Sequence, residues 1–275
     1  MKVQDFARRH SVGVYFCLAF GISWIGALLT GRAIFLQAES VELEELAVMG
    51  ISILAGPLVA GLTMTYLVNG RPGLQDLCAR MVKWRVGGRW YATLLIFPIL
   101  LLVVSLALSA WVSPEMSPTF FAPGIVMGLI AGSVEEVGWM GFAYPIMRLK
   151  QSILRISIYL GFVHALWHIL PSFLGSYHAL GSYWLPYFMG SFAFILALRV
   201  LIVWVYANTG SLLLAQLMHA SSTGFFAMLI PTDIAPANWV IFYWVYAILL
   251  SAAVGVVVAR YGRNLRRQPQ MAKAM

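Results

Sequence analysis

The chain has 275 residues, of which 61% are hydrophobic and only 10% are charged. Soluble domains are about half apolar and a quarter charged, so the composition excludes an ordinary soluble enzyme or binding module. The formal net charge is +8, but no separate basic domain exists in the sequence, so we expect no nucleic-acid partner.

Eight apolar segments follow one another along the chain, each near the roughly 20 residues that cross about 30 Å of hydrocarbon. The fourth is unusually long, and Gly132, Gly138 and Gly141 favour a bend in it. The pattern predicts an all-α, polytopic transmembrane bundle that forms one integral-membrane domain over residues 1–275. The segments are 12–36, 46–69, 91–113, 119–147, 152–173, 184–206, 209–230 and 237–260.

Basic residues predict the orientation of the bundle. They precede the first segment, fill the loops after the second and fourth, and follow the eighth. Cytoplasmic loops carry the excess of Lys and Arg. We therefore expect a protein of the cell (inner) membrane with both termini in the cytoplasm. Arg199 lies late in the sixth segment, and we expect its side chain to snorkel to the inner interface.

Ionisable residues occur at matched depths in three segments. Glu135 precedes Arg148 by 13 residues and His168 follows Arg155 by 13, about 20 Å along a helix in each case. His219 follows Thr209 by 10 residues, about 15 Å. A carboxylate near the bilayer centre costs several kcal/mol unless it faces a polar interior, so this layer predicts a reaction or transport site.

Helical phase gives these residues polar neighbours. Glu135 and Glu136 point about 100° apart, so both can face the interior of the bundle. His164 and His168 share a helix face, as do His219 and Thr223.

Three runs in this order carry a resemblance to a known family. They are Glu-Glu-Val-Gly-Trp-Met-Gly-Phe at 135–142, His-Ala-Leu-Trp-His at 164–168 and His-Ala-Ser-Ser-Thr at 219–223. They resemble the Glu-Glu-x-x-x-Arg, Phe-x-x-x-His and His-x-x-x-Asn motifs of the CPBP intramembrane proteases. This is the CaaX-protease and bacteriocin-processing (Abi) family, which includes the type II prenyl-protein endopeptidases. Gly-Pro-Leu-Val-Ala-Gly at 56–61 is a secondary match, and the core motifs lie within 119–230.

The resemblance implies an intramembrane endopeptidase that cleaves a membrane-associated peptide or protein, lipidated substrates included. Glu135 would be the general base that activates water, His168 would orient the water, and His219 would stabilise the oxyanion. Glu136, His164 and Thr223 would support them. Hydrolysis needs water at this depth, so we expect the active site to open to the cytoplasm, between the fourth, fifth and seventh segments.

The sequence departs from the family motifs at three positions. Met140 stands where the family has arginine, so Glu136 must find another partner or stay protonated. His164 replaces a phenylalanine, and Thr223 replaces an asparagine with a hydroxyl donor of shorter reach.

Other readings stay open at this point. Glu135, His164, His168 and His219 could instead hold Zn²⁺ with a position left for water, although we favour a mechanism without a metal. A proton-coupled carrier would use Glu135 and Glu136 as proton-binding groups, but we find no inverted repeat of the kind such carriers show. A catalytically inactive scaffold that contacts membrane lipids and partners is the third reading.

Overall fold

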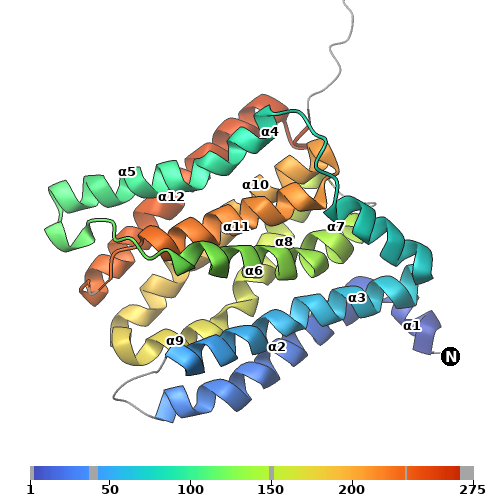
Figure 1. Ribbon diagram of the computed structural model, residues 1–275, viewed down its shortest axis with the longest axis horizontal. Coiled ribbons are helices and arrows are strands. Elements are labelled where there is room, and N and C mark those ends of the chain that lie inside the picture. Colours follow the sequence, from blue (N-terminus) through green and yellow to red (C-terminus); the bar gives the residue numbers. More distant parts are fainter. Residues whose placement is uncertain (1–2, 37–42, 149–151, 233, 267–275) are drawn as a thin grey trace, which may run out of the picture.

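The computed structural model describes residues 3–36, 43–148, 152–232 and 234–266 (Figure 1). Helices dominate these residues and no strand occurs among them, so the predicted all-α class is confirmed. The elements are α1 Val3–Arg9, α2 Ser11–Leu36, α3 Leu43–Met81, α4 Arg89–Ala92, η1 Thr93–Leu95, α5 Ile96–Trp111, η2 Pro114–Met116, α6 Pro123–Gly138, η3 Trp139–Ala143, α7 Tyr144–Met147, α8 Ile153–Trp167, α9 Ile169–Leu180, η4 Gly181–Tyr183, α10 Trp184–Thr209, α11 Leu212–Leu229 and α12 Pro236–Tyr261.

Seven helical stretches among the described residues are long and apolar enough to cross a membrane, which confirms a polytopic bundle. The predicted number of eight differs because the fifth predicted segment, 152–173, is broken. Its first part, α8, is a shorter apolar helix, and α9 runs on through η4 into α10. The candidate spans are Ser11–Gly31, Val48–Met81, Arg89–Trp111, Pro123–Met147, Ile169–Thr209, Leu212–Leu229 and Pro236–Tyr261.

Pro171 gives a physical reason for the break. A proline ring clashes with the carbonyl four residues earlier and removes its hydrogen bond, which here frees the carbonyl of Trp167. That carbonyl accepts a hydrogen bond of 3.0 Å from the indole N–H of Trp24 on α2. The chain therefore turns at His168, between α8 and α9.

The long fourth span changes its winding where the glycines predicted a bend. After α6, the segment η3 is a π-helix, and α7 completes the span. A π-helical turn inserts an extra residue into the helix and is frequent at functional sites. Glu135 and Glu136 occupy the last turn of α6, directly before this segment.

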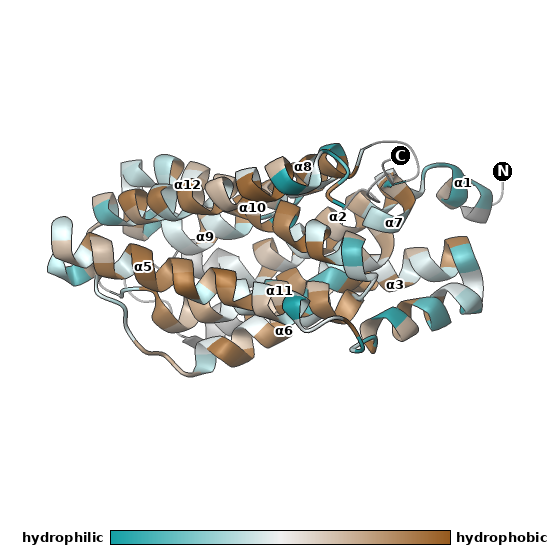
Figure 2. Ribbon diagram, turned by 90° about the horizontal axis from the view of Figure 1, so that it is seen from above, coloured by the Kyte–Doolittle hydropathy of each residue, from teal (hydrophilic) through white to brown (hydrophobic). Residues whose placement is uncertain are grey.

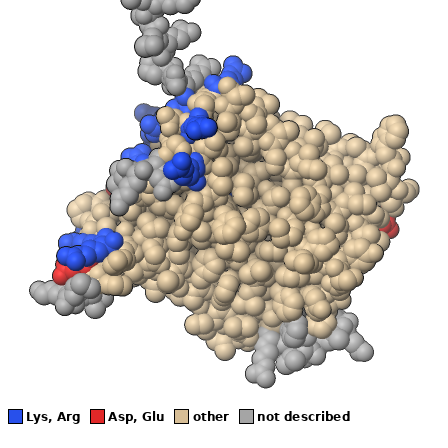
Figure 3. Space-filling model, turned by 180° about the vertical axis from the view of Figure 1, so that it is seen from behind, with Lys and Arg blue, Asp and Glu red and all other residues tan. Residues whose placement is uncertain are grey.

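Charge divides the molecule into two ends. Exposed Lys and Arg side chains gather at what we call the basic end, where α3, α7 and α12 end (Figure 3). What we call the opposite end is formed by the segment 112–122, by η4 and by residues 230–232 and 234–235. Hydrophobic residues cover most of the helices between the two ends (Figure 2). The assignment of the basic end to the cytoplasm remains a prediction from charge.

Three glycines on α6 allow it to touch the backbone of α11. A Cβ at Gly128 would collide with the backbone of Gly224 and Ala220, and Gly124 and Gly132 are equally close to α11. Small residues four apart permit such close helix contact in membranes. This approach brings the glutamates of α6 beside His219 of α11.

We expect Gly128→Val to destabilise the protein by about 1–3 kcal/mol, because the added side chain forces α6 and α11 apart. Thermal unfolding in detergent measures the effect. Gly21→Val on α2 is the matched control, since a Cβ there meets nothing within 4 Å. Equal losses of Tm in the two variants would contradict the close contact.

α10 runs through the centre of the bundle and is buried on all sides from Ala197 to Ala207. Such a helix is surrounded by protein rather than lipid. Gly161 lets α8 approach it closely, because a Cβ at Gly161 would lie 3.2 Å from the Cβ of Arg199. His164, one turn further along α8, therefore faces α10 at the level of Arg199.

Candidate active site

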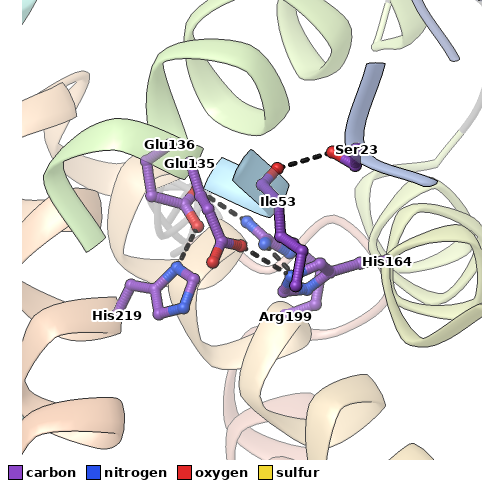
Figure 4. Close-up of polar contacts among 7 residues, drawn as sticks. All are labelled: Ser23, Ile53, Glu135, Glu136, His164, Arg199 and His219. Atoms are coloured by element: carbon purple, nitrogen blue, oxygen red, sulfur yellow. Dashed lines mark hydrogen bonds and ion pairs between the residues drawn. The ribbon is translucent and has the colours of Figure 1, made fainter. Parts of the chain in front are cut away.

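The two glutamates are buried and turn to different partners (Figure 4). Glu135 lies 2.9 Å from His164, measured from its Oε2 to Nε2 of the ring. Glu136 binds Arg199 at 2.6 Å through Oε2 and His219 at 2.7 Å through Oε1. One turn of α6 thus connects α8, α10 and α11 through side-chain contacts.

Arg199 is the centre of this network. Its side chain is 0% exposed, and its second terminal nitrogen lies 3.0 Å from Nδ1 of His164. The expectation that Arg199 snorkels to the membrane interface is therefore wrong. The reason is its place on α10, which is surrounded by other helices, and its pairing with Glu136, which makes burial of the charge tolerable.

The arginine contact fixes the protonation of His164. A guanidinium only donates hydrogen bonds, so Nδ1 of His164 must accept. A neutral imidazole carries its single proton on the other nitrogen, so Nε2–H of His164 donates to the Glu135 carboxylate. Glu136 thus holds Arg199, Arg199 holds His164, and His164 orients the carboxylate of Glu135.

A cavity of about 250 Å³ adjoins the network, with Glu135, His164, His168 and His219 in its wall. Thr223 lines the same cavity. At about 30 Å³ per water, the volume holds several water molecules beside the Glu135 carboxylate. His219 uses Nδ1 for Glu136, which leaves Nε2 for contacts within the cavity.

The structure brings all six predicted site residues together. Glu135, His168 and His219 line one cavity, as do the supporting residues His164 and Thr223. Glu136 stands behind them and holds His219 and Arg199. Met140 is completely buried and follows the pair by one turn. Its lack of charge is offset by Arg199, which supplies Glu136 with a cation from another helix.

Sequence reasoning missed Arg199 as a site residue, although a signal was present. Arg199 is the only Asp, Glu, Lys or Arg between Arg155 and Asp233. Gly210 ends α10 in the left-handed conformation. The number of residues from Arg199 to this turn is similar to the number from the turn to His219. Antiparallel helices joined at such a turn place Arg199 and His219 at one depth.

The cavity does not extend to the basic end, where the sequence analysis placed its opening. Its lining continues from the site along α9, the first half of α10 and the first half of α12. Those parts lead to the opposite end. We expected a passage to the basic loops between the fourth, fifth and seventh segments. This cavity runs in the other direction.

Three of the four residues named for zinc form a compact group of possible ligands. The ligand atoms of Glu135, His164 and His168 all lie within 4.8 Å of one another. A metal at Nε2 of neutral His164 would place the ring proton on Nδ1, where it would face a donor of Arg199. The arginine contact therefore does not fit a zinc site that uses His164.

Comparison with known proteins finds similarity in the part of the chain that holds this cluster. Residues 117–225 match the family described as type II CAAX prenyl endopeptidase Rce1-like. The part of the chain that holds the cluster is thus similar to that family. A CAAX prenyl protease 2 of Methanococcus maripaludis is 30% identical to the chain over 106 residues, which is 37% of this chain.

The matched segment includes α6, η3, α7, α8, α9, η4, α10 and most of α11. It contains every residue of the network in Figure 4 except those of α2 and α3. The match spans only 38% of the length of the Methanococcus protein. Glu135, His168 and His219 all lie within the matched residues. Their roles and the activity of the whole protein are matters for proposal.

Proposed function

We propose that the protein is an intramembrane peptidase that hydrolyses a peptide bond with water activated by Glu135. The observation that carries the proposal is the cavity near the end of α6 that Glu135, His168 and His219 share. Glu135 is on α6, His219 is on α11, and His168 lies between α8 and α9. The ligand atoms of Glu135 and His168 lie within 4.8 Å of each other, a distance that one water molecule can bridge. The Rce1-like match of the same segment supports the reaction type.

The first step is attack by water. A water held between Glu135 and His168 gives a proton to the Glu135 carboxylate as its oxygen bonds to the scissile carbonyl carbon. His164 donates to the other side of that carboxylate and keeps it aimed at the cavity. Because Arg199 holds His164 in turn, the base is positioned before the substrate arrives.

The second requirement is stabilisation of the oxyanion. We assign it to Nε2–H of a protonated His219, with the hydroxyl of Thr223 as a second donor. Two carboxylates and one guanidinium leave the buried cluster with one excess negative charge. A proton on His219 balances that charge, and Glu136 holds it through Nδ1 at 2.7 Å. Collapse of the intermediate then returns the proton of Glu135 to the leaving amine.

The proposal uses no metal, because Arg199 occupies Nδ1 of His164 in the way described above. It places the protein as a multi-pass component of a cell membrane. The substrate is a membrane-associated peptide or protein, and the name of the Methanococcus relative extends the class to prenylated proteins. Membrane lipids surround the bundle as its other partners.

Cleavage of a membrane-peptide library by the purified protein in lipid nanodiscs tests the proposal. We expect products from the native protein and none from Glu135→Ala. Transport of a solute across proteoliposomes without cleavage would select a carrier instead. A folded protein that neither cleaves nor transports would be a scaffold, and either result contradicts the proposed peptidase.

A further inference from the structure

The wall of the site cavity beyond the catalytic residues is rich in hydroxyl groups. Ser176 of α9, Tyr187 and Ser191 of α10, and Tyr243 of α12 all line it. Ser176, Tyr187 and Ser191 are only half-buried, whereas the glutamates at the inner end are buried. These three side chains are therefore more exposed than the glutamates, while Tyr243 is buried.

These hydroxyl groups all lie toward the opposite end of the molecule. Tyr187 and Ser191 are within the first eight residues of α10, which begins at that end, and Ser176 is near the end of α9. Tyr243 is likewise in the first third of α12. The cavity therefore runs from Glu135 away from the basic loops.

Packed side chains close the other direction. Met140, Phe142, Leu214 and Met218 lie between the glutamates and the basic end, and none is more than 2% exposed. A second cavity of about 480 Å³ lies at the basic end, with Phe142 in its wall. The two cavities share no lining residue. Water at the basic end thus meets an apolar layer rather than the carboxylate.

We infer that water and substrate reach Glu135 from the opposite end, through this hydroxyl-lined passage. The inference rests on the proposed peptidase function and names its substrate class. That class is a membrane-associated peptide with polar side chains at the cleavage site, which the serine and tyrosine hydroxyls can hydrogen-bond. If charge sets the orientation as predicted, the passage faces the outside of the cell.

Single cysteines test the direction of access. The native Cys17 and Cys78 are both exposed, so they are first replaced by serine or alanine. Ser176→Cys and Ser191→Cys then report on the passage, and Asn69→Cys reports on the basic-end cavity. Vesicles of known orientation receive a charged, membrane-impermeant thiol reagent on one side at a time.

We expect Ser176→Cys and Ser191→Cys to react from one side of the membrane and Asn69→Cys from the other. Modification of Ser191→Cys should also reduce peptide cleavage to background, because it fills the passage. Reaction of all three cysteines from the same side would overturn the inference. So would full cleavage after complete modification of Ser191→Cys.

The labelling pattern does not depend on turnover, so the two proposals fail separately. A cysteine-free protein that never cleaves peptides contradicts the peptidase, whatever the labelling shows. A protein that cleaves but admits reagent to the passage from the basic side contradicts only the route. A peptide tethered to one face by a lipid anchor adds a direct check: we expect cleavage only when it is tethered on the side that labels Ser176→Cys.

Discussion

Replacing Arg199 with methionine is expected to destabilise the folded protein by about 3–5 kcal/mol, since it leaves Glu136 as an unpaired charge inside the bundle. The guanidinium is 0% exposed and lies 2.6 Å from that carboxylate. Thermal unfolding in detergent should show a large loss of Tm. Arg155→Met, at an exposed position of the basic end, serves as control and should cost little.

A second substitution separates loss of charge from loss of shape. Met140 stands one turn after Glu136, where the resembling family has arginine. We expect Arg199→Met with Met140→Arg to recover part of the lost Tm, because a cation returns to Glu136 from its own helix. If Arg199→Met alone is as stable as Arg155→Met, the buried pair does not hold the helices together.

Glu135→Gln is expected to reduce the rate of peptide cleavage by about 100- to 10,000-fold, the usual contribution of a general base. The amide cannot take the proton of water, but its oxygen still accepts the hydrogen bond of His164. Folding should therefore be preserved, and Tm should stay near that of the native protein. Cleavage assays on both proteins measure the loss.

Glu115→Gln provides a matched carboxylate change far from the site. Glu115 lies in the exposed loop between α5 and α6, where it accepts hydrogen bonds from Asn238 and Ala235. We expect its cleavage rate to equal that of the native protein. A Glu135→Gln variant that cleaves as fast as Glu115→Gln would remove Glu135 from the role of base.

Much of the site could be predicted from the sequence because depth in a membrane follows from position in a helix. Glu135, His168 and His219 were placed in one layer by counting residues from basic loops, and the structure puts them around one cavity. Helical phase added His164 and Thr223. These inferences use only the 1.5 Å rise and the period of the α-helix.

The remaining features depend on contacts between helices that periodicity does not reveal. From the sequence, Arg199 resembles an arginine at the membrane interface, because the sequence of α10 does not show that other helices enclose it. The direction of the cavity depends on side chains such as Met140 and Met218, which pack between the glutamates and the basic end. The break at His168 had a signal in Pro171, but its consequence depends on the indole of Trp24 receiving the freed carbonyl.

Cleavage by protein freed of metal tests the central claim, a glutamate base that works without a metal. The native protein and Glu135→Gln are treated with chelator, and their metal content is measured before the assay. We predict that the native protein still cleaves peptides when its metal content is far below one ion per chain, and that Glu135→Gln does not. Loss of cleavage on chelation, restored by one equivalent of zinc, would contradict the account.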